Sequence, residues 1–292
     1  MKTPLSRVVN AKRLQLLIDY YKRIMMSKKV LITGICGGLG MEMAKGFIKK
    51  GYQVIGVDID DLALEGLEDK LGQEIPTFVC DLRNRGQIEQ LCMEVVHKGV
   101  FPDIWINNAG VATIAPFMEQ IDSFSDVMDI NFNSILYTTH FCVGEMMKRN
   151  QGMIVNIASV AGHAPCPYFT SYNASKFAVV GFTRSLRHEL KLKKIPIDVV
   201  LVSPGFVDTN IINQKSFEFP DFMKFMLSKP EVTGKEIVDG ILKGKNEIFP
   251  TLNGKLLLGL GKVGAPVQDM MGHLMNAKNW KQMFGIEKID PK

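Results

Sequence analysis

The stretch VLITGICGGLGMEMAKGFIKK, which runs from Val30 to Lys50, decides the fold of this chain. A short aliphatic run is followed by glycines and then by apolar residues at helical spacing, so the predicted order is strand, turn, helix. Glycines let backbone N–H groups approach a phosphate, whose charge the helix N-terminus stabilises. A plain turn is the alternative, but the position between strand and helix favours a phosphate-binding turn. The residues assigned to it are Thr33, Gly34, Gly38, Leu39 and Gly40.

The same alternation of strands and helices continues from this stretch to about Phe249. Strands are predicted at VLIT from Val30, QVIGVD from Gln53, TFVCD from Thr77, DIWIN from Asp103, MIVNIAS from Met153, IDVVLVS from Ile197 and EIF from Glu247. Several are apolar at consecutive positions, as expected where helices cover both faces of a parallel sheet. We therefore predict a single α/β domain over residues 27–252, built on a doubly wound parallel sheet of the Rossmann type flanked by helices.

Two segments lie outside this alternation. Residues 1–26 carry apolar side chains at helical spacing between basic residues, which predicts an amphipathic helical extension. We expect this extension to dock on the protein or on a second subunit, and contact with a membrane surface is the less favoured alternative. Residues 253–292 form a C-terminal extension rich in Gly, Leu and Met, to which the sequence assigns no role.

A carboxylate ends the second predicted strand. Asp58 lies 18 positions beyond Gly40 (58 − 40), where a dinucleotide-binding fold places an acid that accepts hydrogen bonds from the adenosine ribose. A surface aspartate at a strand end is the plain alternative. Because the glycine turn and the acid occur together and in the right order, we favour the ribose-binding role.

Three polar side chains form a candidate catalytic group. Ser159 closes a predicted strand, Tyr172 follows it by 13 positions (172 − 159), and Lys176 follows Tyr172 by 4 (176 − 172). The last spacing places Tyr172 and Lys176 on one face of a helix. A tyrosine of pKa near ~10 is a poor base at neutral pH, and a nearby ammonium is expected to lower that pKa. Taken singly, these residues would equally fit a half-buried aromatic ring, a solvated lysine and a strand-end cap.

The ordered landmarks resemble those of the short-chain dehydrogenase/reductase family over about residues 28–249. The matching residues are Thr33, Gly34, Gly38 and Gly40 in the turn, then Asp81, the run Asn107 to Gly110, Asn131, Ser159, Tyr172, Lys176, and the segment with Pro204, Gly205, Val207 and Thr209. One residue departs from the family pattern. Trp105 stands where relatives have a smaller aliphatic side chain, which leaves the local packing of that strand open.

The resemblance implies a role for each matched residue. Asn131, Ser159, Tyr172 and Lys176 match the catalytic tetrad, in which the asparagine position holds a water of the proton relay and the lysine also binds the nicotinamide ribose. Asp81 and Leu82 would lie at the adenine, and Asn108, Ala109 and Gly110 along the cofactor. Pro204, Gly205, Val207 and Thr209 would lie at the nicotinamide end. No metal is implied, and the implied activity is hydride exchange between nicotinamide and an alcohol/ketone pair.

Asp58 also predicts the cofactor, which we expect to be NAD rather than NADP. NADP carries a phosphate on the adenosine 2′-hydroxyl, against which a carboxylate offers like-charge repulsion and no donor. The turn supplies no cation, since Ile35, Cys36 and Gly37 precede Gly38, and Ile59 and Asp60 follow Asp58.

The segment at about 206–228 matches the family's substrate loop and is rich in phenylalanine and methionine, which predicts an apolar substrate lid. The expected substrate is a bulky apolar secondary alcohol or ketone, such as a steroid, a retinoid or a long-chain compound. Packing of these side chains against the domain or a neighbouring subunit is the alternative. Two other functions stay open: an NADPH-dependent 3-oxoacyl reductase and, less favoured, a non-catalytic dinucleotide-binding protein.

Composition narrows the class of protein further. The 292 residues are 46% hydrophobic and 22% charged, as in ordinary globular proteins. No apolar run approaches a membrane span and no signal peptide is apparent, so we expect a cytoplasmic protein. The net charge is +5, but the basic residues do not form the stripe that is typical of nucleic-acid-binding proteins, so we expect no nucleic-acid partner. The five scattered cysteines suggest neither disulfides nor zinc. A homo-oligomer is expected from the resemblance alone.

Overall fold

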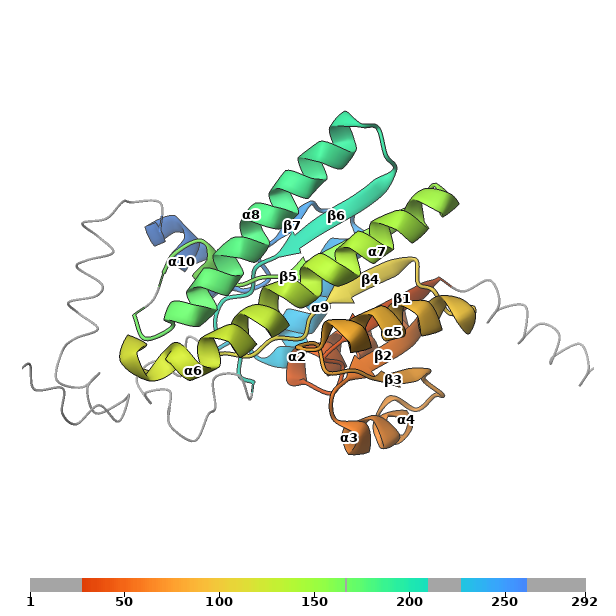
Figure 1. The fold of residues 1–292 in the computed structure, drawn as a ribbon, viewed down its shortest axis with the longest axis horizontal. Helices are drawn as coiled ribbons and strands as arrows, with labels where there is room; N and C mark the ends of the chain where they lie inside the picture. The colour runs from red at the N-terminus through yellow and green to blue at the C-terminus, as the bar shows by residue number, and fades with distance from the viewer. Residues whose placement is uncertain (1–27, 166, 210–226, 262–292) are drawn as a thin grey trace, which may run out of the picture.

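Seven parallel strands form the centre of the molecule (Figure 1). The computed structural model describes residues 28–165, 167–209 and 227–261. The strands are β1 (Lys29–Thr33), β2 (Gln53–Asp58), β3 (Thr77–Val79), β4 (Ile104–Asn107), β5 (Gly152–Ile157), β6 (Ile197–Val202) and β7 (Glu247–Ile248). They lie in the order β3-β2-β1-β4-β5-β6-β7. The predicted doubly wound parallel sheet is therefore confirmed, with each strand within two residues of its predicted bounds.

Helices cover both faces of this sheet (Figure 1). They are α2 (Gly38–Lys49), α3 (Asp61–Glu65), α4 (Leu67–Leu71), α5 (Arg85–His97), α6 (Phe117–Met128), α7 (Ser134–Arg149), α8 (Thr170–Leu192), α9 (Pro230–Leu242) and α10 (Leu252–Gly261). A π-helical turn, η1 (Asp129–Asn133), joins α6 to α7, and a 3-10 turn, η2 (Val160–Gly162), follows β5. In the part of the chain that the structure describes, none of the helices has the length and apolarity needed to cross a membrane.

The central strand β1 shows how the sheet divides the hydrophobic core. Val30 and Ile32 belong to a cluster with Met43 of α2 and Ile237 of α9. Leu31, between them, belongs to a second cluster with side chains of α5, α7 and α8. Because successive side chains of a strand point to opposite faces, an uninterrupted apolar run is what a sheet covered on both faces requires.

The strand order reverses at β1, which pairs with β2 on one side and with β4 on the other. The crossover connections from β1 and β4 therefore leave in opposite directions, which makes the carboxyl ends of these two strands a topological switch point. In open α/β sheets this switch point is where ligands bind. The glycine turn follows β1 directly.

Trp105 of β4, the residue that departs from the family pattern, is fully buried and well accommodated. Its ring packs against Phe101, with 6.4 Å between the ring centroids. Its indole N–H donates to Asn107 Oδ1 at 2.9 Å. The amide of Asn107 then donates to Asn156 at 2.9 Å, and that of Asn156 to Thr183 Oγ1 at 3.0 Å. Its packing is thus complete, because the only polar atom of the large ring has a buried acceptor.

Several predicted features lie outside the described residues. These are the N-terminal helical extension at 1–26, most of the substrate lid, most of the C-terminal extension and Cys166. The other four cysteines are free thiols, at Cys36, Cys80, Cys92 and Cys142.

Candidate active site

The glycine turn is tied to the carboxyl end of β4. Thr33 Oγ1 accepts hydrogen bonds from the backbone N–H groups of Asn108 and Ala109, at 3.0 and 3.1 Å. The Asn108 side chain donates back to the carbonyl oxygens of Thr33 and Gly34, at 2.9 and 3.1 Å. Gly34 has a φ of +64°, a conformation that favours glycine. The glycine turn and the segment after β4, two motifs that are far apart in sequence, are thus joined by hydrogen bonds.

The helix that follows the turn begins without a side-chain cap. Its N-cap residue is Gly37, and its first turn contains no acidic residue. A Cβ on Gly40 would overlap the Gly34 carbonyl oxygen and lie 2.9 Å from Ile35 Cα, so only glycine lets helix and turn approach this closely. The amide groups that open α2, including those of Gly38 and Leu39, are suited to bind a pyrophosphate.

Asp58 lies at the end of β2 with its carboxylate held beside the turn. One oxygen accepts from the backbone N–H of Cys36 at 2.9 Å, and the other from those of Ile59 and Asp60 at 2.8 and 3.3 Å. Burial, with the Asp58 charge as a second cause, raises the pKa of the Cys36 thiol to about 11. The sequence did not predict this contact with Cys36. Because Cys36 belongs to the glycine turn, the contact holds Asp58, the predicted ribose acceptor, next to the predicted phosphate-binding turn.

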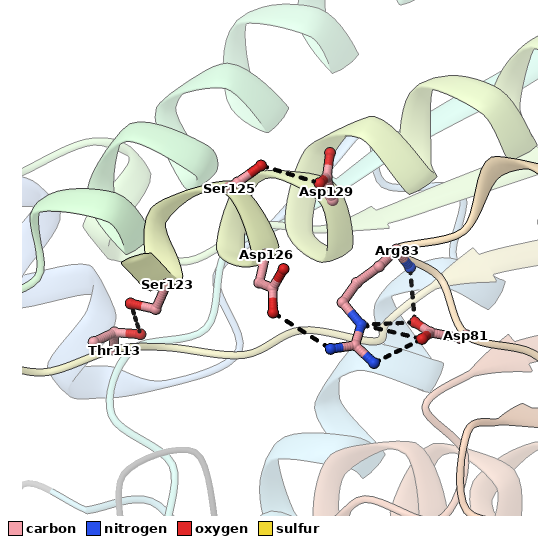
Figure 2. Close-up of polar contacts among 7 residues, drawn as sticks. All are labelled: Asp81, Arg83, Thr113, Ser123, Ser125, Asp126 and Asp129. Carbon is pink, nitrogen blue, oxygen red and sulfur yellow. Dashed lines mark hydrogen bonds and ion pairs between the residues drawn. The ribbon is translucent and has the colours of Figure 1, made fainter. Parts of the chain in front are cut away.

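Asp81, predicted to lie at the adenine, is clamped by an arginine that we did not predict (Figure 2). Arg83 donates from Nε and Nη2 to the Asp81 carboxylate at 3.0 and 2.7 Å, and from Nη1 to Asp126 of α6 at 3.3 Å. The hydrogen bond from Arg83 lowers the pKa of Asp81. Leu82, between them, is buried. The loop after β3 is thereby joined to α6.

Tyr172 and Lys176 lie one turn apart on α8, as predicted, and hydrogen bonding with the Ser159 side chain acts to lower the pKa of Tyr172. Lys176 is buried, and its Nζ donates to the Ile157 carbonyl oxygen at 3.0 Å. This nitrogen lies 5.5 Å from the centroid of the Tyr172 ring. A Cβ added to Gly110 would lie 3.4 Å from Lys176 Nζ. The predicted catalytic residues therefore border the predicted cofactor path.

Asn131 completes the group from the π-helical turn η1, where it is fully buried. Its Oδ1 accepts from the backbone N–H of Val111 at 2.8 Å, and its Nδ2 donates to the Val111 carbonyl oxygen at 2.8 Å and to Ser175 Oγ at 3.0 Å. Such turns contain one residue more than a regular helical turn and occur often at functional sites. The turn thus anchors Asn131 to the segment after β4 and to α8.

The pKa of Tyr172 differs from our expectation. A nearby ammonium was expected to lower it, but burial raises it, and the opposing cause is the hydrogen bond with Ser159. Burial also lowers the pKa of Lys176 to about 8, because the charged ammonium is poorly solvated there. In the protein alone, burial is therefore the largest cause of the pKa shift of both groups.

The segment from Pro204 to Thr209 returns along the same edge. The Pro204 carbonyl oxygen accepts from Val160 N at 2.9 Å, and Gly205 N donates to Thr251 Oγ1 at 2.9 Å. Val207 is buried and forms a backbone bridge with Ser228. A Cβ added to Gly38 would lie 3.2 Å from the Thr209 methyl carbon. The contact from Thr251, immediately before α10, was not foreseen.

The residues predicted to bind cofactor or to act in catalysis thus lie at the last residue of a strand, in the segments that follow the strands, or on the helices and the turn η1. The arrangement can hold a dinucleotide along the edge of the sheet and present a tyrosine hydroxyl for proton transfer. Within the described ranges, no group of His, Cys, Asp and Glu is placed to hold a metal ion.

Comparison with known proteins gives consistent matches. A family model described as short chain dehydrogenase matches residues 28–218, well over half of the chain. The chain is 31% identical over 233 residues to 17-beta-hydroxysteroid dehydrogenase 13 of Mus musculus, covering 78% of this chain and 75% of that protein. It is 30% identical over 233 residues to 3-oxoacyl-(acyl-carrier-protein) reductase FabG of Buchnera aphidicola, covering 79% and 94%. The fold is similar to the crystal structure of a short chain dehydrogenase/reductase from Burkholderia phymatum in complex with NAD, with a TM-score of 0.72, 23% identity, and 80% and 92% coverage.

Proposed function

The chain belongs to the short-chain dehydrogenase/reductase family, and from that premise we propose that it is an NAD(H)-dependent oxidoreductase of a bulky, apolar secondary alcohol or its ketone. The observation that carries the proposal is the placement of Tyr172 and the buried Lys176 one helical turn apart on α8, with Lys176 Nζ close to Gly110 in the segment that is tied to the glycine turn. A homo-oligomer is part of the proposal and rests on the family resemblance, and we also propose the cytoplasmic location that we expect from the sequence.

The side chains divide the work of the reaction between them. A bound nicotinamide would supply the hydride acceptor or donor. In the oxidative direction, Ser159 and Tyr172 hold the alcohol oxygen, and Tyr172 Oη takes its proton. Lys176, anchored on the Ile157 carbonyl oxygen, keeps a positive charge near the developing phenolate. In reduction, Tyr172 donates the proton to the ketone oxygen.

We expect NADH to bind at least about tenfold more tightly than NADPH, a difference of ~1.4 kcal/mol. The Asp58 carboxylate would repel a 2′-phosphate, although its three backbone N–H donors spread part of its charge. Fluorescence titration of both nucleotides measures the difference without any substrate.

Two variants make the cofactor titration specific. Asp58→Ala should weaken the binding of NADH and remove the repulsion of the NADPH phosphate. The difference between the two affinities should therefore become smaller. Asp61→Ala, which removes an exposed carboxylate in the first turn of α3, should change neither affinity. Tighter binding of NADPH than of NADH by the unaltered protein would contradict the role of Asp58.

An apolar substrate is supported by the surroundings of Tyr172 and by the relatives. The Phe169 ring contacts the Tyr172 ring at 6.3 Å between centroids, and one similar protein is named a hydroxysteroid dehydrogenase. We expect turnover of steroid, retinoid or long-chain alcohols, measured as NADH formation across a panel that includes sugars and short hydroxy acids. Turnover confined to those polar compounds would exclude the apolar site.

The second candidate is a 3-oxoacyl reductase, favoured by the similarity to the Buchnera reductase. It requires NADPH as the better cofactor and acyl thioesters as substrates. The same titration and panel, extended to a 3-oxoacyl thioester, therefore decide between the two functions.

A further inference from the structure

A single buried glutamine joins α6 to the start of the catalytic helix. The Gln120 side chain is completely buried and makes four hydrogen bonds. Its Nε2 donates to the carbonyl oxygens of Ala115 and Tyr168, at 2.5 and 2.9 Å. Its Oε1 accepts from Ser171 N and from Ser171 Oγ, both at 3.0 Å. The side-chain amide therefore uses both of its N–H donors and both acceptor positions of its oxygen.

This contact supplies a helix cap that α8 lacks in its own sequence. The N-cap residue of α8, Phe169, makes no capping hydrogen bond with its side chain, and the first turn has no acidic residue. The first amide groups of a helix have no partner within the helix, and a side-chain oxygen usually accepts from one of them. For α8 that oxygen belongs to Gln120, 51 positions earlier in the chain. The start of α8 is therefore fixed relative to α6.

The same amide holds a backbone conformation that is rare for its residue. Tyr168 has a φ of +68°, in the left-handed region that residues with a side chain seldom adopt. Its carbonyl oxygen accepts from Gln120 Nε2 and from Ala115 N, at 2.9 and 3.1 Å. Residues in this conformation persist when their surroundings determine it. Gln120 thus fixes both the loop that enters α8 and the first turn of the helix.

We propose that Gln120 is a positioning residue, which sets where Tyr172 presents its hydroxyl to Ser159. Ser171, the residue that Gln120 holds, immediately precedes Tyr172, and Phe169, the N-cap residue of the same helix, contacts the Tyr172 ring. A small displacement of the first turn of α8 would change the geometry of proton transfer, to which rates are steeply sensitive. The proposal rests on the proposed role of Tyr172 as acid/base.

The test compares two variants of α6 on the substrate identified in the panel. Gln120→Met keeps the length and volume of the side chain and removes all four hydrogen bonds. Val127→Ala is the control, because Val127 is equally buried on α6 and has no polar side chain. We expect Gln120→Met to lower kcat about tenfold with the NADH affinity unchanged, and Val127→Ala to leave kcat unchanged. Equal kcat values in the two variants, per folded protein, would overturn the proposal.

A third variant separates positioning from stability. In Gln120→Glu, a neutral carboxylic acid can still accept from Ser171 and donate one hydrogen bond, whereas an ionised one faces the carbonyl oxygens of Ala115 and Tyr168 without a donor. Burial raises the pKa of such a group, so kcat should be close to normal at low pH and should fall as the pH rises through that pKa. The other ionisable side chains of α6 and of the start of α8 are the same in all the proteins compared, among them Glu119, Asp122, Asp126, Asp129, Tyr168, Tyr172 and Lys176. A pH profile of Gln120→Glu identical to that of the unaltered protein would refute positioning.

Hydrogen–deuterium exchange distinguishes failure of this inference from failure of the proposed function. Exchange of the peptide that spans residues 168–173 should be faster in Gln120→Met than in Val127→Ala, and this readout needs no turnover. Faster exchange with unchanged kcat would leave Gln120 as a structural residue only and would overturn the proposal. Retained activity of Tyr172→Phe would instead remove the acid/base role itself.

Discussion

Replacing Tyr172 with phenylalanine is expected to lower kcat by between about 10²- and 10⁴-fold, the range typical of a lost acid/base. The change removes the hydroxyl that is hydrogen-bonded to Ser159 and keeps the ring that contacts Phe169. The fold and the dinucleotide affinity should therefore survive. Steady-state turnover, together with NADH titration of the same preparation, measures both quantities.

A second tyrosine provides the matched control. Tyr52 directly precedes the amino end of β2, whereas the site lies at the carboxyl ends of the strands. Its ring packs against Phe47, with 5.2 Å between the ring centroids. Tyr52→Phe removes a hydroxyl without touching the site and should leave kcat unchanged. A Tyr172→Phe variant that turned over like Tyr52→Phe would rule out Tyr172 as the acid/base.

Replacing Lys176 with methionine is expected to cost about 10²-fold or more in kcat/KM at neutral pH and to weaken NADH binding. Burial raises the pKa of Tyr172, and Lys176 is the buried side chain one helical turn away, so the variant removes the positive charge that would favour a phenolate formed during the reaction. The remaining alcohol oxidation should increase with pH, because the phenolate then forms only at higher pH.

At alkaline pH, kcat/KM of the unaltered protein should fall as the pH rises, which is the opposite of the trend expected for Lys176→Met. Burial lowers the pKa of Lys176 to about 8, so the lysine is charged below that pH and loses its charge above it. The support that the ammonium gives to the phenolate is lost over the same interval. Profiles of kcat/KM from roughly pH 6 to pH 10 should show this ionisation in the unaltered protein and not in Lys176→Met. Lys193→Met, in an exposed ion pair with Glu189 beyond the far end of α8, is the control. A retained ionisation in Lys176→Met would assign it to another group.

The strands could be predicted closely from sequence because their apolar runs are uninterrupted. The largest errors lie at their carboxyl ends, where the predicted TFVCD and MIVNIAS segments extend past Val79 and Ile157, the last paired residues. An apolar pattern does not show where the neighbouring strand ends. Asp81 and Ser159 therefore lie in the loops beyond the strands, where a side chain is free to face a ligand.

The parts of the site that could be predicted are those whose residues are close in sequence, such as the glycine turn and the pair of Tyr172 and Lys176. Gln120 could not be predicted, because in sequence it is one polar residue of an amphipathic helix and its partner Ser171 is 51 positions away. Arg83 likewise meets Asp126 only through the fold. The pKa of Tyr172 was predicted in the wrong direction, since sequence shows the neighbouring charge and not the extent of burial.

The π-helical turn η1 has a consequence for comparing this chain with its homologues. From Phe117 to Arg149 the backbone is helical throughout, and η1 acts as one residue inserted into it. Deleting that residue would restore regular helical bonding and rotate α6 by about 100° relative to α7. Gln120 lies before η1 and Asn131 lies within it, so the two residues could not both keep their partners. A homologue whose alignment opens a one-residue gap at 129–133 would therefore have lost the geometry of the site, even if its tyrosine and lysine were intact.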